Sequence, residues 1–85
     1  MIALVGAGNV ATWIARELKG NKDFPVGQVF SRSMPNACEV AQIVGAEPID
    51  DIRSLSPHCD VYLFALKDDC YSEVLSQIPF QMPLA

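Results

Sequence analysis

The stretch Met1–Ala11, MIALVGAGNVA, decides the fold of this chain. Its first five residues are an apolar run rich in β-formers, which predicts a strand that is buried on both faces. The glycine-rich turn Gly6–Ala11 follows this strand directly and opens a helix. In such a turn the first glycine allows the tight bend, and the second lets a ligand approach the backbone. The small third position, here an alanine, lets helix and strand pack closely.

The helix predicted after this turn, Asn9–Lys19, is amphipathic. Its apolar face consists of Val10, Ala11, Ile14, Ala15 and Leu18. Its first turn offers unpaired N–H groups and the positive end of the helix dipole to an anion. A GxGxxA turn in this context is typical of domains that bind the pyrophosphate of a dinucleotide, although the glycines alone could simply make a tight turn. We favour pyrophosphate binding and assign it to Gly6, Ala7, Gly8, Asn9, Val10 and Ala11.

Strands and helices alternate along the rest of the chain. Further strands are expected at Val26–Phe30, Glu47–Ile49 and Val61–Ala65, and a fifth begins at Met82–Ala85. A second helix is expected from the Ser31–Pro35 segment to Gly45, with Ser33 as N-cap, and a short helical turn lies between Asp50 and Pro57. A third helix is expected from Asp69 to Gln77, with an inner face of Tyr71, Val74, Leu75 and Ile78.

This order of elements predicts an α/β protein. Strands that alternate with helices form an open parallel sheet with right-handed crossovers and helices on both faces. The chain stops after about five strands, so we expect residues 1–85 to be the incomplete front part of a larger protein.

Composition excludes several other classes of protein. The net charge is −4, and six scattered cations do not form the basic patch that nucleic acid or a membrane surface requires. No apolar stretch approaches the roughly 18 residues of a membrane span. The three cysteines, Cys38, Cys59 and Cys70, show no CxxC spacing, and His58 is the single histidine. We therefore predict no disulfide framework, no metal site, and a cytoplasmic chain with reduced thiols.

The end of the second predicted strand carries a second signal. Domains that prefer NAD place an acidic residue there to hold the ribose 2′-hydroxyl. Here the sequence is Phe30-Ser31-Arg32-Ser33, with no acid. A guanidinium at Arg32, with hydroxyls at Ser31 and Ser33, suits a 2′-phosphate and predicts a preference for NADP of about 10- to 150-fold. The alternative is a solvated arginine and a serine that only caps a helix.

A third signal follows the fourth predicted strand, at Ala65-Leu66-Lys67-Asp68. Ligands of open α/β sheets lie beyond the carboxyl ends of the strands, so the backbone of Ala65, Leu66 and Lys67 is expected near the nicotinamide half of a dinucleotide. The side chain of Lys67 faces either the ligand or solvent. We expect Asp68 and Asp69 to cap a helix rather than to act as catalytic acids, and we assign no catalytic residue.

Together GAGNVA, FSRS and FALKDD resemble the N-terminal cofactor domain of the pyrroline-5-carboxylate reductase and deazaflavin-dependent NADP reductase type. The resemblance is greatest to an uncharacterised bacterial branch of oxidoreductases. It implies a Rossmann-like fold, NADP as cofactor, and the same contact residues. It also implies a separate helical domain, absent from this chain, that binds substrate and forms a homodimer. Asp68 replaces the proline of the reductases' AVKP-like segment, which removes a direct claim to pyrroline-5-carboxylate chemistry.

These signals favour the NADP(H)-binding domain of an oxidoreductase that acts on an unknown small molecule. On its own, the 85-residue chain is expected to bind cofactor weakly and to turn over no substrate. A non-catalytic nucleotide sensor would carry the same motifs, whereas a protein-interaction module would bind no nucleotide. A methyltransferase would normally have an acid after the second strand, and Ser31 and Arg32 argue against that class.

Overall fold

A computed structural model of the chain describes residues 1–66 and 68–80, with side chains for residues 1–66 and 73–80. Within this part, four strands form one parallel sheet: β1 (Ile2–Val5), β2 (Val26–Phe30), β3 (Glu47–Ile49) and β4 (Val61–Phe64). Their order across the sheet is β3-β2-β1-β4. The predicted fifth strand, Met82–Ala85, lies outside the described residues.

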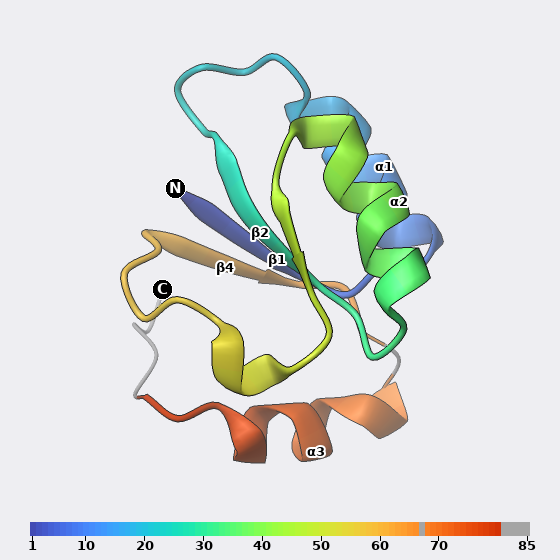
Figure 1. Ribbon diagram of the computed structural model, residues 1–85, viewed down its shortest axis with the longest axis vertical. Coiled ribbons are helices and arrows are strands. Elements are labelled where there is room, and N and C mark those ends of the chain that lie inside the picture. The colour runs from blue at the N-terminus through green and yellow to red at the C-terminus, as the bar shows by residue number, and fades with distance from the viewer. Residues whose placement is uncertain (67, 81–85) are drawn as a thin grey trace.

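Helices cover both faces of this sheet (Figure 1). One face carries α1 (Asn9–Leu18) and α2 (Met34–Val44), and the other carries α3 (Asp68–Gln77) with a short 3₁₀ turn, η1 (Ile52–Ser54). This arrangement confirms the predicted α/β class, the parallel sheet and the helices on both faces. Ser33 occupies the N-cap position of α2, as predicted, but its hydroxyl makes no capping hydrogen bond.

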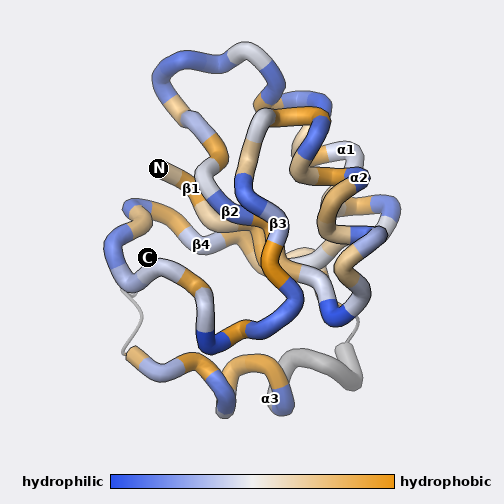
Figure 2. The backbone as a smooth tube through the Cα atoms, in the orientation of Figure 1, coloured by the Kyte–Doolittle hydropathy of each residue, from blue (hydrophilic) through white to orange (hydrophobic). Residues whose placement is uncertain are grey.

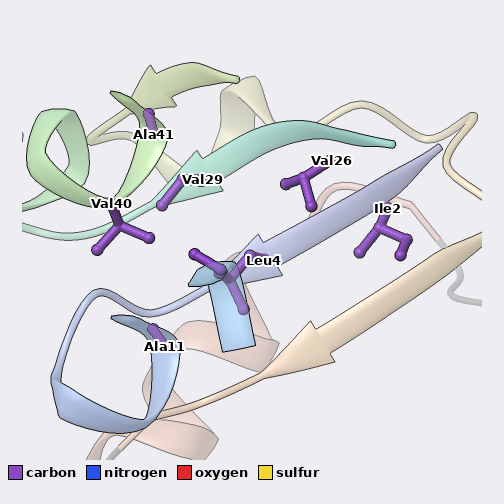
Figure 3. Close-up of a cluster of buried hydrophobic side chains, with 8 residues drawn as sticks. Ile2, Leu4, Ala11, Val26, Val29, Val40 and Ala41 are labelled. Atoms are coloured by element: carbon purple, nitrogen blue, oxygen red, sulfur yellow. The ribbon is translucent and has the colours of Figure 1, made fainter. Parts of the chain in front are cut away.

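The first core layer lies between the sheet and the helices α1 and α2 (Figure 3). Its buried side chains are Ile2, Leu4, Ala11, Ala15, Val26, Val29, Val40 and Ala41. Alanines at the helix positions allow α1 to sit close to β1. The prediction for Val10 is wrong, because this side chain is 62% exposed. Val10 lies in the first turn of α1. Ala11 and Ala15 form the middle of the apolar face that contacts the sheet, and Val10 lies at the margin of this face.

A bulge in β2 determines which of its side chains enter this layer. Ile2 pairs with Val26 and Ala3 pairs with Gln28, so Gly27 is an extra residue in the ladder. Strict alternation would place Val26 and Gln28 on the same face. The extra residue turns Val26 toward α1 and α2, and leaves Gln28 facing the opposite side.

The second core layer lies between the sheet and α3. It contains Ala3, Val5, Phe30, Ile49, Ile52, Leu55, Cys59 and Val74. Val74 is the buried anchor of α3, and Ile78, one turn later, packs against the same cluster. The prediction that Leu75 faces inward is wrong, because Leu75 is 46% exposed. Among the described side chains of α3, Val74 is buried against the second core layer, and Leu75 lies about 100° further round the helix. The side chain of Tyr71, also predicted to face inward, lies outside the described residues.

Gln28 brings a polar group into this apolar layer, and its side chain forms hydrogen bonds with β3 and with the segment that follows it. Its side-chain nitrogen donates to the carbonyl oxygen of Ser54 at 3.2 Å and to a carboxylate oxygen of Glu47 at 3.4 Å. Its side-chain oxygen accepts from the backbone N–H of Ser56 at 2.7 Å. The amide therefore fixes the connection that leads from β3 to β4.

Replacing Gln28 with the apolar methionine should destabilise the fold. Gln28→Met leaves the partly buried N–H of Ser56 without its acceptor, at a cost of about 1–3 kcal/mol. Gln42→Met, the same exchange at an exposed site on α2, should change the free energy of unfolding by less than about 0.5 kcal/mol. Urea denaturation followed by circular dichroism measures both. Equal effects of the two substitutions would contradict this role for Gln28.

Candidate functional site

The candidate site lies at the edge of the sheet where the parallel strands end. Two backbone hydrogen bonds continue the ladder beyond the strands. The N–H of Gly6 donates to the carbonyl oxygen of Phe30, and the N–H of Ala65 donates to the carbonyl oxygen of Val5, each at 2.8 Å. The glycine turn after β1 is thereby held between the ends of β2 and β4.

Gly6 has to be a glycine for reasons internal to the protein. Its φ is +130°, a conformation that residues with a side chain rarely adopt. A Cβ at this position would overlap the carbonyl group of Ala65, with 2.8 Å to the carbonyl carbon. The turn therefore passes directly against the end of β4, where no side chain fits.

Gly8 differs, because no contact within the protein requires a glycine there. It is the N-cap of α1 with φ −88° and ψ −161°, an extended conformation open to any residue. Among the described residues, and apart from its neighbours in the chain, a Cβ on Gly8 would meet no atom within 4 Å. The space above this backbone is open, as close approach of a phosphate requires.

The start of α1 has the polarity that an anion needs. No side chain caps this helix end. The first intrahelical bond runs from the N–H of Thr12 to the carbonyl oxygen of Gly8 at 2.9 Å, so the preceding amides of the first turn have no intrahelical acceptor. Asn9 and Val10 are exposed, whereas Ala11 is buried and serves as the small packing position. Ala7 packs against the first core layer.

The loop after β2 places its predicted phosphate-binding residues at the same edge of the sheet. Ser31 donates its N–H to the carbonyl oxygen of Ile49 at 3.0 Å, and its hydroxyl accepts from the N–H of Ser33 at 3.1 Å. This turn is closed by its own hydrogen bonds and carries the exposed Arg32 at its tip. The hydroxyl hydrogen of Ser31 remains available to a ligand, since its oxygen acts here as an acceptor.

Arg32 contacts a residue that the sequence analysis did not consider. Its Nη1 lies 3.4 Å from Oε2 of Glu73 on α3. Both side chains line a cavity of about 380 Å³, whose walls are Phe30, Arg32, Asp50, Asp51, Ile52, Glu73, Val74 and Gln77. The connection after β3 that supplies the two aspartates is largely hydrophilic (Figure 2). In the sequence, the adjacent aspartates Asp50 and Asp51 were the available sign of an acidic cavity. They are too far from Arg32 along the chain for the sequence to show that all three residues line one cavity.

The carboxylates of this cavity differ in their partners. Asp51 accepts hydrogen bonds from Arg53, at 3.1 Å from Nε and 2.8 Å from Nη2. These bonds lower the pKa of Asp51 below its usual value. Glu73 is instead paired with Arg32, so the two arginines hold carboxylates from different elements.

The third predicted segment lies beside the glycine turn. Ala65 packs against the first core layer and Leu66 against the second, so the chain leaves β4 between the two layers. The backbone of Ala65 reaches the turn at Gly6. Lys67 and the side chains of Asp68 and Asp69 lie outside the described residues, and their predicted roles stay predictions.

Several residues outside the candidate site are also described by the structure. Trp13 is 63% exposed on α1. Cys59 is buried, and burial raises the pKa of its thiol. In the described part of the chain, no three His, Cys, Asp or Glu side chains are grouped to hold a metal ion. Likewise, no helix among those residues is long and apolar enough to cross a membrane.

One solved structure is similar to this chain in both fold and sequence. The crystal structure of a "putative NADP oxidoreductase" from Bacteroides fragilis matches this chain with a TM-score of 0.83 and 42% sequence identity. The match covers 91% of this chain and 30% of that protein, so the chain spans less than a third of the neighbour's length. No protein-family model and no curated protein matches the chain.

The fold and the open glycine turn define a Rossmann-like α/β domain. The solved neighbour supports this fold class, because its structure matches the chain with a TM-score of 0.83. The finer resemblance to pyrroline-5-carboxylate and deazaflavin-dependent reductases, and the contact residues assigned from the sequence, stay predictions.

The contact between Gly6 and Ala65 predicts unequal effects of alanine at two glycines. Gly6→Ala should cost more than about 3 kcal/mol or prevent folding, because backbone strain adds to overlap with a backbone carbonyl. Gly45 also has a positive φ, but at +70° it lies in the left-handed helical region, and there is open space around a new Cβ among the described residues. Gly45→Ala should cost only about 1–2 kcal/mol. Thermal unfolding of both variants measures the difference, and equal losses would contradict the close approach of β4.

Proposed function

We propose that this chain is the NADP(H)-binding domain of an NADP-dependent oxidoreductase acting on a small molecule. The observation that carries the proposal is the open backbone at Gly8, at the uncapped start of α1. The first turn of a helix stabilises a pyrophosphate through its free N–H groups and through the helix dipole. The description of the neighbour as an NADP oxidoreductase supports NADP as the ligand.

In this proposal the pyrophosphate contacts the backbone of the glycine turn, at Gly6, Ala7, Gly8, Asn9, Val10 and Ala11. The 2′-phosphate contacts the loop after β2, where Arg32 supplies a positive charge and Ser31 and Ser33 supply polar groups. The two regions are joined by the hydrogen bond from Gly6 to Phe30, the residue directly before that loop. Pyrophosphate and 2′-phosphate sites therefore lie on one rigid edge of the sheet.

The nicotinamide half is then directed toward Ala65, Leu66 and Lys67. The close approach of Ala65 to Gly6 supports this assignment, because it brings the start of the segment next to the glycine turn. When bound, NADP(H) supplies the hydride chemistry, and this chain's residues bind and orient it. Substrate binding, a homodimer and a cytoplasmic location belong to the proposal for the longer protein.

The Gly8 position separates ligand binding from folding. Gly8→Val introduces a side chain into the space assigned to the pyrophosphate and should weaken NADPH binding at least tenfold. Its effect on stability should stay within about 2 kcal/mol, because the new Cβ meets no atom of the described residues beyond its chain neighbours and the position is outside the helix interior. Isothermal titration calorimetry and thermal unfolding measure the two effects. Unchanged NADPH affinity in the folded variant would overturn the pyrophosphate assignment.

The Arg32 position reports on the 2′-phosphate. Arg32→Ala should weaken NADPH binding about tenfold and leave NADH binding within about twofold, because only NADPH loses a charge-assisted contact. Arg16→Ala, which removes the same charge from an exposed site in the last turn of α1, is the matched control and should leave both affinities unchanged. Equal loss of NADPH and NADH binding would contradict the 2′-phosphate role.

A further inference from the structure

The starting observation is the ion pair that joins Arg32 to α3. Arg32 and Glu73 are 41 positions apart in the chain, yet their charged groups approach to 3.4 Å. The two side chains are 54% and 57% exposed, so water and a ligand both reach them. An exposed pair of this kind is weak enough for a strongly charged ligand to displace.

We propose that Glu73 is a specificity-determining residue, which weakens NADP binding by competing with the 2′-phosphate for Arg32. This inference rests on the proposed function, because it assumes that Arg32 receives the 2′-phosphate. A 2′-phosphate bound to the Arg32 guanidinium would bring a second negative charge close to the Glu73 carboxylate, and the two anions would repel each other. Binding of NADP therefore breaks or weakens the pair, whereas binding of NAD leaves it in place.

The charges around the cavity act in the same direction. Asp50 and Asp51 line it together with Glu73, so three acidic residues surround the space beside Arg32. Asp51 is occupied by Arg53. Among the acidic residues that line the cavity, Glu73 contacts the arginine assigned to the 2′-phosphate, and a phosphate placed there would face it as a like charge. A ribose 2′-hydroxyl carries no charge and can donate a hydrogen bond to a carboxylate.

The position of Glu73 is fixed by its neighbour in the helix. Val74 is buried in the second core layer and anchors α3 against the sheet. Glu73 is therefore held at the mouth of the cavity rather than on a freely moving loop. Because Arg32 belongs to a turn closed by its own hydrogen bonds, the pair joins two well-anchored elements.

The test compares NADPH and NADH binding to the protein and to its Glu73→Gln variant by isothermal titration calorimetry. The variant should bind NADPH about two- to fivefold more tightly and NADH within 1.5-fold of the original affinity, as expected for loss of one exposed charge interaction. Glu17→Gln, which removes the same charge from an exposed site late in α1 on the opposite face of the sheet, should change neither affinity. If Glu73→Gln and Glu17→Gln increased NADPH affinity equally, the cause would be the change in net charge, and the inference would be overturned.

A second comparison establishes that Glu73 acts through Arg32. In an Arg32→Ala background, Glu73→Gln should change NADPH affinity by less than about 1.5-fold, because the competed group is gone. A gain that persists in this background would overturn the competition. If the protein binds NADPH and the single Glu73→Gln variant leaves the ratio of NADPH to NADH affinity unchanged, the inference alone fails. If neither dinucleotide binds the protein or any variant, the proposed function fails with it.

Discussion

The close approach of the first turn to the end of β4 is the constraint on which the rest of the structure depends. Because Gly6 has no side chain, the chain can leave β1 against the carbonyl of Ala65 and enter α1 at once. The small residues Ala11 and Ala15 then bring this helix down onto the sheet. Any displacement of this turn would move the helix start away from the strand edge, and with it the amides proposed to bind a pyrophosphate.

The two glycines of the turn have different tasks, which their shared motif does not separate. At Gly6 the protein itself excludes a side chain, whereas at Gly8 it leaves the space empty. A glycine without an internal structural reason points to a requirement from outside the chain. This contrast supports a ligand at the turn more directly than the GxGxxA pattern does, since a tight bend alone would need only the first glycine.

Local sequence signals were sufficient for most elements of the fold. The apolar runs of β1 and β2 and the spacing of Ala11 and Ala15 in α1 each follow from periodicity over neighbouring residues. The exposure of Val10 and Leu75 depends on how far each helix overlaps the sheet, which periodicity does not contain. The pairing of Arg32 with Glu73 required the tertiary fold, because the two residues belong to elements separated by two strands.

The Gln28 amide makes pairing of β2 in a wrong register unfavourable. Hydrophobic contacts tolerate many arrangements of similar shape, whereas a buried amide is stable only when its partners are in place. If β2 slipped by one residue, this group would turn to the opposite layer and lose Ser54 and Ser56 together. In such a misfolded sheet, the Gln28 amide and the backbone groups of Ser54 and Ser56 would all lack their hydrogen-bond partners. This one side chain therefore favours the correct register of β2 during folding.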